Sequence, residues 1–248
     1  LARATRQRTL VVVDLSGSVL LGGQRASMIG GVRQLGQALL SENHELAVYG
    51  FDGRPDLVPL GFFSHAAEDL EASLRKIAEA QVVDDSTNLH GAVVNAIALL
   101  DQAVKEIDKG DVIAQGNLVL FTDGKDLAAR VSARRALAAV AASAHEVFTI
   151  GLGSEVDSAA LADLGRSGAF FVQHTEDITR AFQDVSARLE ALARRDYFVS
   201  YCTPARAGGH EVTIRAKDGD RRGEVSVAFF ADGFGAGCRP EDVPLARF

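Results

Sequence analysis

Near the start of the chain, one acid and two hydroxyls stand at every second position directly after an apolar run. The segment LVVVDLSGSV covers residues 10–19 and carries Asp14, Ser16 and Ser18 behind four apolar residues. Two later segments offer similar groups, Thr87 within the polar stretch DDSTNLHGA and Asp123 after the apolar run LVLF. Carboxylate and hydroxyl oxygens are the ligands that hard divalent cations prefer. Two carboxylates balance the charge of such an ion, so we expect a Mg²⁺ site, with Mn²⁺ or Ca²⁺ as alternatives.

The elements that must position these groups alternate regularly along the chain. Near-continuous apolar runs predict strands at 10–14, 45–51, 57–60, 117–121, 146–151 and 169–173. Helical spacing predicts helices at 24–41, 68–80, 89–108, 131–144, 158–167 and 177–195. This order is typical of an α/β fold with a doubly wound, mostly parallel sheet and helices on both faces. The short connection between the second and third strands favours an antiparallel hairpin at the sheet edge.

In an open sheet of this class, ligands bind beyond the carboxyl ends of the strands. Asp14, Ser16 and Ser18 follow the first predicted strand, and Asp123 follows the strand at 117–121. If the chain stays extended beyond the first strand, the side chains of Asp14, Ser16 and Ser18 point to one side. A simpler alternative is that Asp14 and its serines cap the following helix.

Together the five residues resemble the signature of the von Willebrand factor A family, the domain also found in integrins. DLSGS is similar to the DxSxS motif of that family, and Thr87 and Asp123 match its later Thr and Asp. The resemblance covers about residues 9–195 and implies a Rossmann-like fold with a complete metal-ion-dependent adhesion site. It implies that Asp14, Ser16 and Ser18 hold the ion and that Thr87 and Asp123 exchange roles when a partner arrives.

The function that the resemblance implies is non-enzymatic binding or adhesion, in which a Glu or Asp of a protein partner completes the metal shell. Two alternatives stay open: a subunit of an intracellular ATPase or chelatase complex, and a Mg²⁺-dependent phosphohydrolase. Asp85, His90 and Lys125 are candidates for the rim of the ligand surface. A solvated acidic loop explains Asp84 and Asp85 more simply, as an ordinary helix position explains His90.

Composition limits the partners further. A net charge of −7 argues against a nucleic-acid surface. The apolar runs fall short of the roughly 18 residues that a membrane span requires, so we expect none.

The pattern changes at residue 197, where period-two alternation begins in YFVSYC, HEVTIRA and EVSVAFF. We therefore expect a metal-binding domain at 1–196 and a β-rich extension at 197–248. Both cysteines, Cys202 and Cys238, lie in this extension, and their pairing as a disulfide would indicate an oxidising compartment. With the richness in Ala, Arg and Gly, this predicts an exported bacterial protein in the periplasm or at the cell surface. Two free thiols would favour the intracellular alternative.

Overall fold

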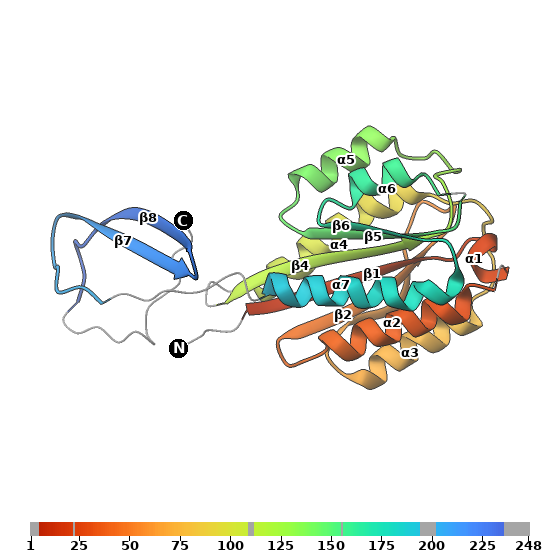
Figure 1. Ribbon diagram of the computed structural model, residues 1–248, viewed down its shortest axis with the longest axis horizontal. Coiled ribbons are helices and arrows are strands. Elements are labelled where there is room, and N and C mark those ends of the chain that lie inside the picture. The colour runs from red at the N-terminus through yellow and green to blue at the C-terminus, as the bar shows by residue number, and fades with distance from the viewer. Residues whose placement is uncertain (1–4, 22, 109–111, 155, 194–201, 236–248) are drawn as a thin grey trace. The chain divides into compact units, whose positions relative to one another are not determined.

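The computed structural model describes residues 5–21, 23–108, 112–154, 156–193 and 202–235 (Figure 1). The chain divides into two compact units, residues 3–197 and residues 198–248 with 1–2. Within the described ranges, no helix is both long enough and apolar enough to cross a membrane.

The larger unit is built on a six-stranded sheet in the order β3-β2-β1-β4-β5-β6. Its strands are β1 (Thr5–Asp14), β2 (His44–Phe51), β3 (Val58–Ser64), β4 (Ile113–Thr122), β5 (Glu146–Leu152) and β6 (Gly168–Val172). The neighbouring pairs are parallel except β2 and β3, which pair antiparallel at one edge. The doubly wound, mostly parallel sheet and its edge hairpin are therefore confirmed.

Helices cover both faces of this sheet (Figure 1). They are α1 (Gly17–Leu21), α2 (Arg25–Leu39), α3 (Ala67–Glu79), α4 (Leu89–Ile107), α5 (Ala133–Ala142), α6 (Ser158–Leu164) and α7 (Ile178–Ala193), with a 3₁₀ turn at Thr175–Asp177. Helices α2, α3 and α7 pack into one apolar core, and α4, α5 and α6 pack into the other. This arrangement explains why the central strands are apolar on both sides.

Strand β1 lies at the centre and faces both cores. Residues 10–13 are fully buried. Val11 and Val13 point into the core under α2 and α7, while Leu10 and Val12 point into the core under α4. Burying each such side chain contributes roughly 1.5–3 kcal/mol, so the position of β1 in the sheet is strongly fixed.

β1 and β4 begin earlier than the apolar runs predicted, at Thr5 and Ile113. The residues added to β1 are polar, and Thr9, the last of them, bonds to the two neighbouring strands. Asn117 Nδ2 donates to Thr9 Oγ1 at 3.2 Å, and His44 Nε2 lies 2.7 Å from the same hydroxyl. Apolarity alone therefore underestimates strands whose polar ends are satisfied by their neighbours.

The described part of the smaller unit contains an antiparallel hairpin of β7 (Gly209–Asp218) and β8 (Arg221–Phe230). Val212 pairs with Val227 and Ile214 with Val225, so the two predicted antiparallel strands are confirmed. The strand predicted at 197–202 falls almost entirely outside the described residues. Because Cys238 also lies outside them, the disulfide between Cys202 and Cys238 stays a prediction.

Candidate metal site

The site is built where β1 and β4 end side by side. Asp14 is the last residue of β1 and Thr122 is the last residue of β4. The Asp14 side chain is fully buried. Its Oδ2 accepts a hydrogen bond from Thr122 Oγ1 at 2.6 Å, and its Oδ1 accepts one from the Ser16 backbone N–H at 2.9 Å. The carboxylate is thus held in one orientation at the carboxyl edge of the sheet.

Ser16, Ser18 and Asp123 are linked to one another beside Asp14. Ser18 Oγ donates to Asp123 Oδ1 at 2.8 Å, and the hydroxyls of Ser16 and Ser18 are 3.2 Å apart. The expectation of an extended segment through Ser18 is wrong, because the chain turns into helix α1 at Gly17. This short helical turn, rather than strand alternation, brings the Ser18 hydroxyl to Asp123.

Thr87 reaches the same edge from the loop before α4. It is 3% exposed, and its backbone oxygen accepts from Ala128 N at 3.1 Å. A Cβ added to Gly124, the residue after Asp123, would lie 3.4 Å from Thr87 Oγ1. Asn88 holds the loop by capping α4, since its side chain accepts from Gly91 N at 3.2 Å. The structure therefore brings all five predicted residues to one edge of the sheet.

Burial makes the Asp14 carboxylate costly to ionise in the absence of a cation. Loss of solvation is the main cause that raises its pKa, and the nearby Asp123 charge also raises it, so that the pKa rises from 3.8 to about 6 in the folded protein. The hydrogen bonds from Ser16 and Thr122 act in the opposite direction. A bound cation would offset this unfavourable term by neutralising both carboxylates.

The donor set fits a hard divalent cation. It consists of oxygens from two carboxylates and three hydroxyls, which such ions accept as ligands. Within the described ranges, no three His, Cys, Asp or Glu side chains are grouped closely enough to hold a metal ion. A cation held here would therefore also need neutral oxygens, and the hydroxyls of Ser16, Ser18 and Thr87 are the ones available at this edge.

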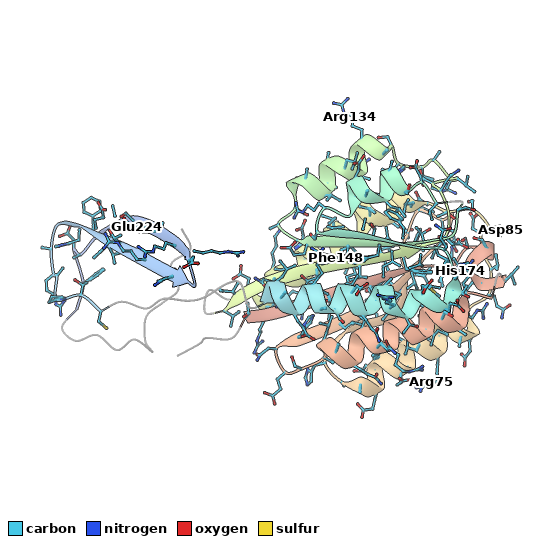
Figure 2. The ribbon with its side chains drawn as sticks, in the orientation of Figure 1. Arg75, Asp85, Arg134, Phe148, His174 and Glu224 are labelled. Atoms are coloured by element: carbon cyan, nitrogen blue, oxygen red, sulfur yellow. The ribbon has the colours of Figure 1, made fainter. Side chains whose placement is uncertain are left out.

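The three predicted rim residues lie in different environments. Asp85 is exposed, and its carboxylate packs against Gly17. A Cβ added to Gly17 would overlap that carboxylate. Figure 2 shows Asp85 at the same end of the sheet as α1. Lys125 is exposed. His90 instead turns away from solvent, and its Nδ1 lies 2.8 Å from Asp126 Oδ2, with the two side chains 13% and 8% exposed.

Asp126, which follows Lys125 in the sequence, occupies an unusual position beside the predicted site. Its Oδ2 contacts His90, while its Oδ1 is buried without a hydrogen-bond partner among the described residues. The signal in the sequence was its place three residues after Asp123, which gave no indication that the carboxylate would be buried.

The loops around the site are braced by interactions that sequence reasoning did not identify. Asp84 Oδ1 accepts from the Ser86 backbone N–H at 3.0 Å and from Ser86 Oγ at 2.7 Å. These bonds, which help to keep the pKa of Asp84 below its ordinary value, shape the loop before Thr87. Arg130 Nε donates to the backbone oxygen of Gly53 at 2.5 Å and so ties the loop after β4 to the loop after β2.

Residues 7–169 match the family model described as von Willebrand factor type A domain. The chain belongs to the von Willebrand factor type A family. A comparison with curated proteins found no match.

Solved structures share the type A fold at low sequence identity. A von Willebrand factor type A protein from Catenulispora acidiphila is 15% identical with a TM-score of 0.62, over 74% of this chain and 42% of that chain. Proximal thread matrix protein 1 of the mussel byssus, with a zinc-occupied MIDAS motif, is 16% identical with a TM-score of 0.58, over 76% and 46%.

The vWF domain of the type V pili tip protein Mfa5 from Porphyromonas gingivalis is 12% identical with a TM-score of 0.58, over 79% of this chain and 99% of that chain. At these identities the likeness shows the fold alone. This chain spans less than half the length of the Catenulispora acidiphila and mussel proteins.

Proposed function

We propose that residues 1–196 form a divalent-cation-dependent protein-binding module. Asp14, Ser16, Ser18, Thr87 and Asp123 would hold the ion, and a Glu or Asp of the partner would bind to it. Membership of the type A family supports this proposal, because these domains are mainly interaction modules rather than enzymes. The observation that carries it is the buried Asp14 carboxylate, held by Thr122 and Ser16 beside a second carboxylate.

Each residue of the site would have a defined role toward the ion. Asp14 and Asp123 supply two negative charges, and three hydroxyls supply neutral oxygens. Because the charges sum to zero with a divalent ion, the bound metal would remain electrophilic toward one further carboxylate. Mg²⁺ fits best since it accepts few carboxylates, and Mn²⁺ or Ca²⁺ are alternatives. The zinc-occupied motif named for the mussel protein supports a divalent ion in general.

We propose adhesion outside the cytoplasm as the setting of this binding. The pilus tip protein among the structural neighbours supports this location. The proposed disulfide between Cys202 and Cys238 would agree with it. Mass spectrometry after thiol labelling of the unreduced, unfolded protein tests this part. We expect neither cysteine to be labelled, and two labelled cysteines would favour the intracellular alternative.

Calorimetric titration with Mg²⁺ and Mn²⁺ tests the metal site. We expect saturable binding by the wild type and loss of binding in Asp14→Ala, because that change removes one of the two ligand charges. Asp184→Ala is a matched control. It removes an exposed acid of helix α7, away from the loops that carry the proposed ligands, and it should keep binding. Equal heats for the wild type and Asp14→Ala would contradict the proposal.

A further inference from the structure

Exposed apolar side chains occur on each of the three loops that carry the proposed metal ligands. Leu21 is 79% exposed at the end of α1, Val83 is 65% exposed before Thr87, and Leu127 is 70% exposed after Asp123. Among the described residues of the larger unit, the other exposed large apolar side chains are Phe62 at 72% and Phe171 at 41%, on the edge strands β3 and β6. Exposed apolar residues are therefore concentrated around the metal site.

Contacts between the loops hold these three side chains around one edge. Leu21 lies one helical turn beyond Ser18, which bonds to Asp123. Val83 stands two residues before Asp85, whose carboxylate packs against Gly17. Leu127 precedes Ala128, whose N–H donates to the Thr87 backbone oxygen. Scattered apolar residues are normal on protein surfaces, but here one comes from each of three loops that contact one another.

Charge restricts what such a surface can bind. The three loops, residues 14–24, 80–88 and 123–132, carry five acids and two bases. The acids are Asp14, Asp84, Asp85, Asp123 and Asp126, and the bases are Lys125 and Arg130. The loops therefore stay negative by about one charge after a divalent ion binds. A partner with a run of acids would be repelled, whereas one carboxylate on the ion would not.

We propose that Leu21, Val83 and Leu127 form an apolar rim, and that the partner is a protein segment with one acidic side chain between apolar side chains. This inference rests on the proposed function, since the acid is the group that would bind the ion. The rim would select among acidic segments by burying the neighbouring apolar side chains. The metal–carboxylate contact would make an acid necessary for binding. The apolar rim would favour apolar residues on either side of that acid.

Selection from a random 12-residue peptide library displayed on phage tests the inference. The full chain is immobilised in Mg²⁺, and bound phage are eluted with chelator. We expect the wild type to enrich one Asp or Glu flanked by Leu, Ile, Val or Phe. The triple variant L21S/V83S/L127S should keep the acid and lose the apolar flanks. Phe62→Ser, which removes an exposed apolar residue from β3, is the matched control and should enrich the same peptides as the wild type.

The possible outcomes separate the two proposals. Enrichment of an acid without apolar flanks by the wild type would overturn the rim and leave the proposed function standing. Failure to enrich any acid-containing, chelator-eluted peptide would overturn both. Because the three residues are exposed, the triple variant should unfold at the same urea concentration and bind Mg²⁺ as the wild type does. A synthetic peptide from the wild-type selection should bind the triple variant at least about tenfold more weakly.

Discussion

Replacing Asp14 by Asn separates the stability of the metal-free protein from its ability to bind metal. Burial raises the pKa of Asp14 from 3.8 to about 6. At pH 8 the carboxylate is ionised in both the folded and the unfolded protein, but its ionisation is less favourable in the folded one. Each unit of pKa difference between the folded and unfolded protein corresponds to about 1.36 kcal/mol. The charged Asp14 therefore lowers the free energy of unfolding by about 3 kcal/mol. Asn carries no charge and avoids this loss.

The geometry of the site reduces the expected gain. An Asn carbonyl can accept from Ser16 N as Asp14 Oδ1 does, so that hydrogen bond is kept. Thr122 Oγ1, which donates to Asp14 Oδ2, would instead face an amide donor and lose its acceptor. One lost hydrogen bond costs about 1 kcal/mol. We therefore expect Asp14→Asn to raise the free energy of unfolding by about 2 kcal/mol at pH 8 in chelator.

The pH dependence provides the sharper test. Because the folded-state pKa is raised, the wild type loses stability as the pH rises from 3.8 through 6, and the loss is complete above that range. The advantage of Asp14→Asn should therefore grow between about pH 4 and pH 6 and then level off. Urea unfolding followed by circular dichroism measures it. Saturating Mg²⁺ should stabilise the wild type and leave the variant unchanged. An advantage that does not depend on pH, or a less stable variant at pH 8, would refute the reasoning.

Two further predictions concern packing and pH away from the metal site. Gly31→Ala should destabilise the protein by about 1–3 kcal/mol, because the new Cβ would overlap the buried ring of Phe182. Gly30→Ala on the same helix should be neutral or stabilising by up to about 1 kcal/mol, since the nearest atom, Thr179 Oγ1, is 3.8 Å away. Equal urea midpoints for both variants would contradict this account. Burial lowers the pKa of His44 from 6.5 to about 4. The neutral His44 therefore contributes about 3 kcal/mol to the free energy of unfolding above pH 6.5, relative to low pH, and this contribution is lost as the pH falls toward 4. The difference in unfolding free energy between the wild type and His44→Gln should shrink over this range, and a constant difference would argue against it.

The sequence was most informative where chemistry and buried strands coincide. Residues 10–13 had to be a central strand, because apolar side chains on both sides require two cores. The strands before Asp14 and Asp123 therefore predicted that these acids would meet at one edge. The pairing of β1 with β4 places them there.

Other features could not be predicted because they depend on contacts between distant loops. The turn of helix α1 at Gly17 is five residues long, too short for a periodic signal. The burial of Asp126 depends on His90, which is 36 positions away. The brace from Arg130 to Gly53 crosses 77 positions. No local pattern specifies such pairings, although each one fixes the surroundings of the metal site.

The register of β1 has an evolutionary consequence. Its side chains alternate between two cores, and Asp14 follows the last of them directly. Inserting or deleting one residue within 10–13 would exchange the residues that face each core and would also move Asp14 away from Thr122. Selection for folding and selection for metal binding therefore forbid the same length changes. Loop segments such as 124–132 can vary in length with less damage to the sheet. Among homologues that bind different partners, we expect these loops to differ in length and sequence, whereas the length of β1 stays constant.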